Sequence, residues 1–278
     1  MTVTLASGRV LAGAAFGPES ASPVLFVAGA GTGKSMCFGV DQLGPAGLRL
    51  LTMDRPGMGG SSPDEGRSVA STAQDYRAFV SSVTGMRSPH LPVVANSQGA
   101  LFGLAIAAAG WASSLTLVSP ADEVAYPAIH DMLPPEATRL SDMVRDDPQA
   151  ATEMLGSFTA EAMENMVLAG SDQGDRAFYL SASFNAMYRT ALAEGFAGNA
   201  PGYVRDTLMA MAPWPVDLGS IACPVRILFG AEDRVHSPDL GEMLSARIPT
   251  AVRQVIHGEG GSLLWTRPEL TLAPLAVR

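Results

Sequence analysis

Short apolar segments alternate with helical patterns over the first part of the chain. Pro23–Ala28, Leu48–Met53 and Leu91–Asn96 are apolar and bounded by Gly or Pro, which is typical of buried strands in a parallel sheet. Between them, Ser68–Thr84 begins with serine and places its apolar residues at helical spacing. Gly99–Gly110 is small and apolar nearly all round, as expected for a helix buried against a sheet. This alternation predicts a doubly wound, mainly parallel α/β sheet.

Three further apolar segments have the same character, but the last two lie far along the chain. They are Ser113–Pro120, Pro224–Gly230 and Thr250–His257. The interval 121–218 is rich in Met and Ala and shows no strand pattern, so we expect several helices there. We call this insertion the cap, because helices above the carboxyl ends of parallel strands would cover a pocket. The predicted organisation is therefore a core of residues 1–120 and 219–278 with a helical cap of residues 121–218.

Composition and charge limit the classes of partner. The 278-residue chain has 18 basic and 27 acidic residues and a net charge of −9, which argues against nucleic acid because phosphates attract basic surfaces. No run of about 18 apolar residues predicts a membrane span, and the N-terminal stretch lacks the basic residues that open a signal peptide. Cys37 and Cys223 form no disulfide framework, which favours a cytoplasmic protein. Since no cluster has metal-ligand spacing, we expect neither metal nor cofactor. A homodimer and a monomer are both compatible with the sequence.

The segment Val93–Gly103 has the pattern of a nucleophile elbow, the sharp strand-to-helix turn that presents a catalytic serine. Ser97 stands at its centre. Ala95 and Gly99 flank it with the small side chains that so tight a turn requires. The alternative is an ordinary turn in which the serine only caps the following helix.

Four segments together resemble the α/β-hydrolase superfamily, in its capped group of esterases, haloperoxidases and lactonases. They are the elbow, the Gly-rich stretch Val24–Gly33, DRPGMGGSS at Asp54–Ser62, and GAEDRVHSP at Gly230–Pro238. The third is similar to the family signature D-x-x-G-x-G-x-S, and the fourth to its acid loop G-x-x-D-x-x-x-P. The resemblance implies Ser97 as nucleophile and Asp233 as the acid that orients a histidine. It also implies an oxyanion hole made by the backbone amides of Ala30 and Gln98.

The histidine departs from the family pattern. The histidines of the chain are His90, His130, His236 and His257. When HGEGGSLLWTRPEL at His257–Leu270 is aligned with the family's G-x-G-H pattern, the histidine position falls on Gly261, which cannot take a proton. We assign His257 as the base through a shifted loop, with His236 beside the acid loop as its rival. Two other interpretations stay open: a histidine was replaced in this chain, or the fold has a role that needs no serine–histidine relay.

Two alternatives concern the acid and the Gly-rich loop. Asp122 and Glu123 follow a predicted strand at a point where some members of the superfamily place their acid, but Asp233 lies in the better motif. Ala28–Ser35, which contains the single lysine Lys34, fits a relaxed phosphate-loop pattern. The oxyanion role already explains these glycines, whereas nucleotide binding would leave the elbow unexplained.

The sequence thus predicts a serine hydrolase that acts on the ester, thioester or lactone carbonyl of a small apolar substrate. Ser97 attacks, a histidine takes its proton, and Asp233 orients the histidine. The sparsely charged, Met-rich cap favours an apolar substrate. The rival interpretation is a hydrolase-fold protein with a non-hydrolytic role, as a lyase, a cyclase or a ligand-binding protein.

Overall fold

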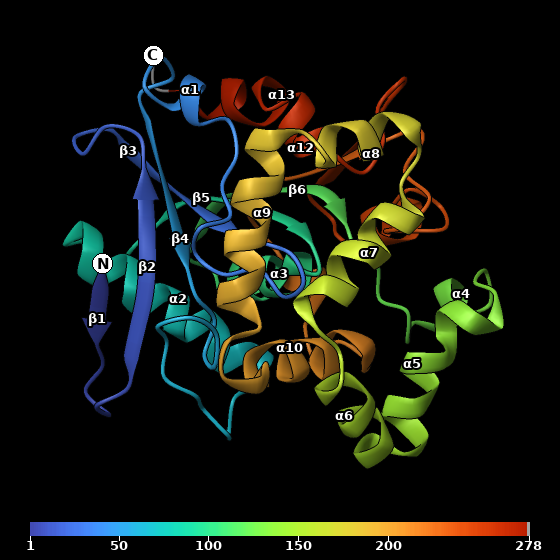
Figure 1. Ribbon diagram of the computed structural model, residues 1–278. Helices are drawn as coiled ribbons and strands as arrows, with labels where there is room; N and C mark the ends of the chain where they lie inside the picture. Colours follow the sequence, from blue (N-terminus) through green and yellow to red (C-terminus); the bar gives the residue numbers. More distant parts are fainter. Residues whose placement is uncertain (277–278) are drawn as a thin grey trace.

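An eight-stranded sheet runs through the protein in the computed structural model, which describes residues 1–276 (Figure 1). The strand order is β1-β2-β4-β3-β5-β6-β7-β8. β2 pairs antiparallel with β1 and with β4, and all other neighbours run parallel. The strands are β1 (Thr2–Thr4), β2 (Val10–Phe16), β3 (Ser22–Val27), β4 (Leu48–Met53), β5 (Leu91–Ser97), β6 (Ala112–Pro120), β7 (Val225–Gly230) and β8 (Ala251–Ile256).

The helices divide between the core and the insertion that follows β6. Those of the core are α1 (Val40–Leu43), α2 (Val69–Thr84), α3 (Gly99–Ala108), α11 (Glu242–Ala246), α12 (Leu263–Thr266) and α13 (Glu269–Leu272). Those of the insertion are α4 (Pro127–His130), α5 (Pro135–Asp146), α6 (Pro148–Gly156), α7 (Ala160–Gly170), α8 (Gln173–Tyr179), α9 (Ala182–Gly195) and α10 (Pro201–Met211). Short 3₁₀ turns span Ala197–Asn199, Leu218–Ser220 and Ala273–Leu275.

The central strands form where the apolar segments predict them because both of their faces are buried. Along β3, Leu25 and Val27 enter one hydrophobic cluster, and Val24 and Phe26 enter a second cluster on the opposite face. This alternation follows from the two-residue period of a strand. The prediction of a doubly wound, mainly parallel α/β sheet with a helical insertion is confirmed.

The two helices predicted from the sequence also form, and local signals fix their ends. Ser68 caps α2 through a reciprocal pair of hydrogen bonds with Ser71, and Gly85 ends the helix in the left-handed region with φ 73°. α3 has no polar face and is buried along Gly99–Ala107, which places it against the sheet. Both helices contribute to the same hydrophobic cluster, so they cover one face together.

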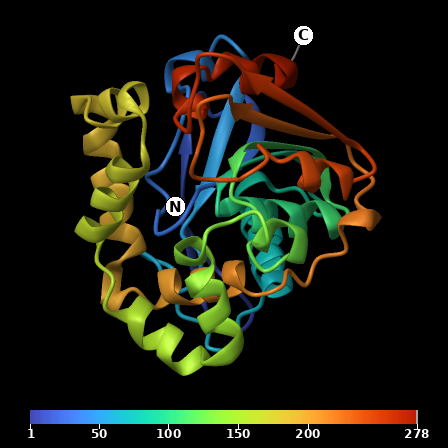
Figure 2. The same cartoon turned by 90° about the vertical axis from the view of Figure 1, so that its right-hand side faces the viewer.

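The cap is inserted between β6 and β7, and its helices α7 to α9 lie along one side of the core (Figure 2). The end of α9 touches the loop after β3, because a Cβ on Gly195 would lie 1.9 Å from the Gly31 carbonyl oxygen. Only glycine permits this approach. The loop that follows β3 is therefore held between the sheet and the cap. The division into core and cap domains at residues 120 and 218 stays a prediction.

Within residues 1–276, no helix combines the length and apolarity needed to cross a bilayer. Over the same residues, no group of three or more His, Cys, Asp or Glu side chains is arranged to hold a metal ion. Cys37 is buried and Cys223 half-buried, and both are free thiols.

Candidate active site

The turn between β5 and α3 presents Ser97 at the helix N-terminus. Ser97 has a φ of 52°, a left-handed backbone conformation that residues other than glycine rarely adopt. A Cβ on Gly99 would lie 2.3 Å from the Val27 carbonyl oxygen, and one on Gly103 would lie 2.8 Å from the Ala95 Cβ. The small residues of the motif are thus required by the close packing of the turn on β3 and of α3 on β5. Within residues 1–276 the Ser97 hydroxyl makes no hydrogen bond, and the residue lines a cavity.

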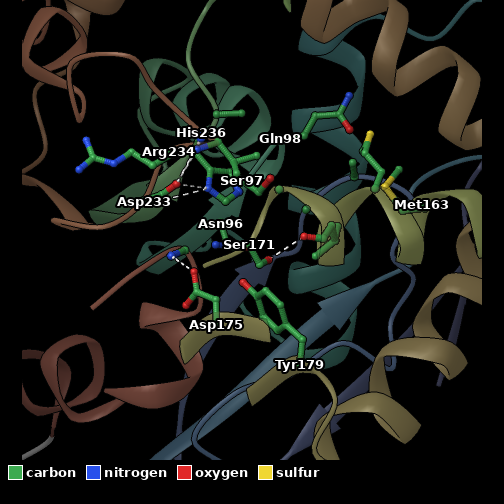
Figure 3. Close-up of a pocket in the computed structure, with 18 of the residues that line it drawn as sticks. Asn96, Ser97, Gln98, Met163, Ser171, Asp175, Tyr179, Asp233, Arg234 and His236 are labelled. Atoms are coloured by element: carbon green, nitrogen blue, oxygen red, sulfur yellow. Dashed lines mark hydrogen bonds and ion pairs between the residues drawn. The ribbon is translucent and has the colours of Figure 1, made fainter. Parts of the chain in front are cut away.

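The loop after β7 supplies both an acid and a histidine. Asp233 is 2% exposed, and its Oδ1 and Oδ2 lie 3.0 and 2.9 Å from His236 Nδ1. Figure 3 shows Ser97, Asp233 and His236 close together among the side chains that line the cavity. Because Nδ1 bonds the carboxylate, Nε2 is the ring nitrogen left to exchange a proton.

The charges of this pair shift both pKa values. Burial acts to raise the pKa of Asp233, but attraction to His236 and the hydrogen bonds it accepts outweigh burial and bring that pKa down to about 2. Burial acts to lower the pKa of His236, but attraction to Asp233, the hydrogen bond between them and the nearby charge of Asp175 raise it above the ordinary 6.5.

The structure does not bring His257 to this pair. His257 lies exposed in the turn after β8 and is not among the residues that line the cavity. Gly261 does line it, and a Cβ on Gly261 would lie 3.3 Å from His236 Cε1. The imidazole of His236 therefore lies next to Gly261, the position at which the sequence motif led us to expect a histidine.

Asp122 lines the cavity but has other partners. Its Oδ2 accepts a hydrogen bond from Ser237 Oγ at 2.9 Å, and its Oδ1 accepts one from the Glu123 amide at 2.9 Å. Burial raises the pKa of its carboxyl. Its backbone amide donates to the His236 carbonyl oxygen at 2.9 Å. The structure thus pairs Asp233 with the histidine, while Asp122 supports the loop that carries it.

The loop after β3 lies beside Ser97. A Cβ on Gly29 would lie 3.1 Å from Ser97 Cβ and 3.5 Å from its Oγ. The amides of Ala30 and Gln98 donate no hydrogen bond within residues 1–276, and both residues line the cavity. Two backbone donors that lack a protein acceptor next to a serine hydroxyl are suited to bind a developing oxyanion.

The phosphate-loop interpretation finds no support in the surroundings of Lys34. Its ammonium pairs with Asp54 at 3.0 Å and with Glu194 of α9 at 2.7 Å. The Glu194 carboxylate also accepts hydrogen bonds from the Ser35 amide and hydroxyl. Lys34 therefore ties the cap to the core instead of facing an open anion site.

A cavity of about 550 Å³ extends from Ser97 towards the cap. The cap contributes mainly apolar and aromatic side chains to its wall, among them Met163, Met166, Tyr179, Phe184, Tyr188 and Tyr203. Burial raises the pKa of Tyr203 to about 12, so its hydroxyl stays protonated. Because most of these side chains are apolar or aromatic, the cavity can accommodate an apolar molecule.

Asp175 joins the cap to the loop after β8. This buried residue of α8 accepts hydrogen bonds from the Gly261 amide at 2.7 Å and the Ser262 amide at 3.0 Å. A Cβ on Gly260 would lie 2.3 Å from one of its oxygens. No pattern in the sequence marks Asp175, because its partners are backbone amides far along the chain.

A strand-to-helix serine turn in a mainly parallel eight-stranded sheet with a helical insertion defines the α/β-hydrolase fold. The model of the alpha/beta hydrolase family matches residues 24–273, and the chain belongs to this family. Comparison with curated proteins finds no match.

Several solved structures share the fold at low sequence identity. A hydrolase from Pseudomonas aeruginosa has a TM-score of 0.69 and 19% identity over 98% of this chain and 95% of its own. The enol-lactonase from Burkholderia xenovorans has a TM-score of 0.68 and 17% identity over 99% and 97%. A thermophilic esterase from Thermogutta terrifontis has a TM-score of 0.64 and 17% identity over 99% and 95%. At these identities the likeness establishes the fold.

Proposed function

We propose that the protein is a serine hydrolase that cleaves an ester, thioester or lactone carbonyl of a small apolar substrate, with His236 as its base. The observation that carries the proposal is the Asp233–His236 pair in the cavity that Ser97 also lines. His257, the base assigned from the sequence, is exposed outside that cavity. His236 fills the role without any change of loop position.

The geometry supports an acyl-transfer sequence. Ser97 Oγ attacks the carbonyl carbon while its proton passes to His236 Nε2. The amides of Ala30 and Gln98 stabilise the oxyanion, and the imidazolium then returns the proton to the departing alcohol, thiol or hydroxyl. Water, deprotonated by the same nitrogen, then attacks the acyl carbon; the bond to Ser97 Oγ breaks, the acid product leaves, and the imidazolium returns its proton to Oγ. Asp233 holds the imidazole by Nδ1 and stabilises its cationic form throughout.

The cavity wall favours a neutral substrate over an anionic one. The acidic side chains of Asp172, Asp175 and Glu232 line it together with Asp233, and the cation Arg234 lies 3.8 Å from Glu232. A carboxylate entering this cavity would meet like charge, most strongly near the buried Asp175 and Asp233, where little water screens the repulsion, and more weakly near the exposed Asp172 and Glu232.

We therefore expect p-nitrophenyl hexanoate to be hydrolysed with a kcat/KM at least about tenfold above that of mono-p-nitrophenyl adipate, its equivalent with a terminal carboxylate. The methyl ester of the adipate is the control, because it is polar but uncharged and should behave like the hexanoate. Steady-state release of p-nitrophenol measures all three. Equal rates for the charged and neutral esters would contradict the proposed substrate class, and no turnover of any of them would count against a hydrolase.

The pH dependence should reveal the raised pKa of His236. A general base must be neutral, so kcat/KM is retained above that pKa and lost as the pH falls through it. We expect the acid limb to lie above pH 6.5, the ordinary value for histidine. Asp233, with its pKa of about 2, stays ionised across this range.

An Asp175→Asn variant provides the control for that profile. It removes one of the negative charges that raise the pKa of His236 but leaves the Asp233 contact in place. Its acid limb should move to lower pH than that of the unchanged protein. A limb at or below pH 6.5 in the unchanged protein, or no movement in the variant, would contradict the assignment of the limb to His236.

A further inference from the structure

The side chain of Arg55 reaches the loop that carries the Ala30 amide. Arg55 follows β4 and is 1% exposed. Its Nη1 donates to the Ala28 carbonyl oxygen at 2.8 Å, and its Nη2 donates to the Gly29 carbonyl oxygen at 2.8 Å. The planar guanidinium thus binds two successive carbonyl groups with its two terminal nitrogens, a geometry that suits arginine and not lysine.

These contacts, together with the hydrogen bond that Thr32 Oγ1 donates to the Gly29 carbonyl oxygen at 3.0 Å, fix the direction of the neighbouring amides. In a trans peptide unit, the carbonyl and the following N–H point in opposite directions, and the described residues contain no cis peptide bond. The Gly29 carbonyl and the Ala30 N–H belong to one such unit. Since the carbonyl is directed at Arg55, the Ala30 N–H is directed away from Arg55. Gly29, in the same peptide unit, packs closely on Ser97.

Arg55 is itself held by the cap. Asp206 of α10 is fully buried and accepts hydrogen bonds from Arg55 Nε and from Arg67 Nη2. The guanidinium carbon of Arg55 also lies 5.2 Å from the centre of the Phe102 ring. Asp206 carries one negative charge but binds two arginines. The carbonyl dipoles of Ala28 and Gly29 therefore provide further stabilisation for the positive charge of Arg55.

The same cap helix contacts the second proposed oxyanion donor. Thr207, next to Asp206, accepts a hydrogen bond from the Gln98 side chain at 3.3 Å. Thr207 and Tyr203 of α10 both line the cavity. α10 is therefore linked to the substrate wall, to the residue that follows Ser97 and, through Arg55, to the loop after β3.

We propose that Arg55 is a positioning residue that aims the Ala30 amide at the oxyanion, and that Asp206 holds Arg55 in place from the cap. The inference rests on the proposed hydrolase function and adds a residue that touches neither substrate nor reacting atoms. Donors that are fixed before the reaction stabilise the transition state without reorganising. The loss of Arg55 should therefore affect the chemical step more than substrate binding.

The test compares Arg55→Met with Arg67→Met. Both arginines are 1% exposed and bind Asp206, but Arg67 reaches the carbonyls of Pro56 and Gly202, away from the oxyanion loop. In each variant, Asp206 keeps one arginine, so neither leaves a buried carboxylate unpaired. We expect kcat of Arg55→Met to fall about 10- to 100-fold with KM within about threefold, and kcat of Arg67→Met to stay within about threefold.

Arg55→Gln carries the same expectation and replaces Arg55→Met if that variant does not fold. Arg55→Lys, which can still donate to a loop carbonyl, should recover part of the lost kcat. Equal losses of kcat in the Arg55 and Arg67 variants would overturn the inference and leave a purely structural ion cluster.

A crystal structure of the Arg55 variant separates this inference from the proposed function. We expect the peptide unit between Gly29 and Ala30 to rotate or to lose its single orientation once its carbonyl keeps only the Thr32 hydroxyl as a partner, and Thr32→Val in the Arg55 variant removes that partner too. If that unit keeps its direction, the inference fails whatever the kinetics show. If the unchanged protein hydrolyses no ester, the proposed function fails, but the crystal structure still decides whether Arg55 orients the amide.

Discussion

Replacing His236 by alanine is expected to lower kcat/KM for an apolar ester by about 10⁴- to 10⁶-fold, because a serine hydroxyl without a base is a poor nucleophile at neutral pH. His257→Ala is the matched control. It removes the exposed histidine that the sequence motif favours, and it should leave kcat/KM within about twofold of the unchanged protein. Steady-state kinetics on p-nitrophenyl hexanoate measure both. A large loss in His257→Ala with little loss in His236→Ala would reverse the assignment.

The space beside Gly261 offers a complementary variant. In the unchanged protein, a side chain at Gly261 would press on His236, since its Cβ would lie 3.3 Å from Cε1. In the double variant His236→Ala, Gly261→His, that space is open, and the new histidine occupies the position at which the sequence motif predicts a base. We expect the double variant to regain about tenfold or more of the activity that His236→Ala loses. Gly261→His alone should lower activity.

Replacing Ser97 by alanine is expected to reduce kcat by about 10⁴- to 10⁶-fold with the fold intact, because it removes the attacking oxygen and nothing that holds the turn. Ser171→Ala is the control, since Ser171 also lines the cavity but its hydroxyl donates to the Val167 carbonyl at 2.6 Å. Circular dichroism and thermal unfolding should show both variants folded. Retained turnover in Ser97→Ala would show that the elbow serine is not the nucleophile.

The parts of the site that the sequence reveals are those set by short-range geometry. The elbow is recognisable because Ser97 needs small neighbours within a few residues: a Cβ on Gly99 would lie only 2.3 Å from the Val27 carbonyl oxygen. The bounds of β4 coincide with the apolar segment Leu48–Met53 for a similar reason, since a strand that is buried at all positions but one ends where the apolar run ends.

The proposed base, His236, could not be assigned in this way, because its position depends on two loops that meet only in the folded chain. The family pattern directs attention to the loop after β8, where Gly261 stands. The spacing of Asp233 and His236 on one loop was the available signal. His236 has room in the site because Gly261 has no side chain. The sequence shows the glycine, but it does not show that Gly261 lies beside the imidazole.

The cap was predicted only as a helical insertion. The roles of its individual residues follow from contacts with parts of the chain that are distant in sequence. Asp175 binds the amides of Gly261 and Ser262, and Asp206 binds Arg55, across 86 or more positions of the chain. Neither carboxylate belongs to a motif. Lys34 matches a phosphate-loop lysine in sequence, but the fold pairs it with two carboxylates, and the sequence motif does not reveal these partners.

The most direct test of the central claim, that His236 activates Ser97, needs no knowledge of the substrate. A fluorophosphonate reacts with a serine only when a base has activated it, and intact mass spectrometry counts the adducts over time. We predict a single adduct on Ser97, formed at similar rates in the unchanged protein and in His257→Ala, and at least about 10³-fold more slowly in His236→Ala. Labelling of His236→Ala at the rate of the unchanged protein would contradict the claim. No labelling of the unchanged protein would instead favour a non-hydrolytic role for the fold.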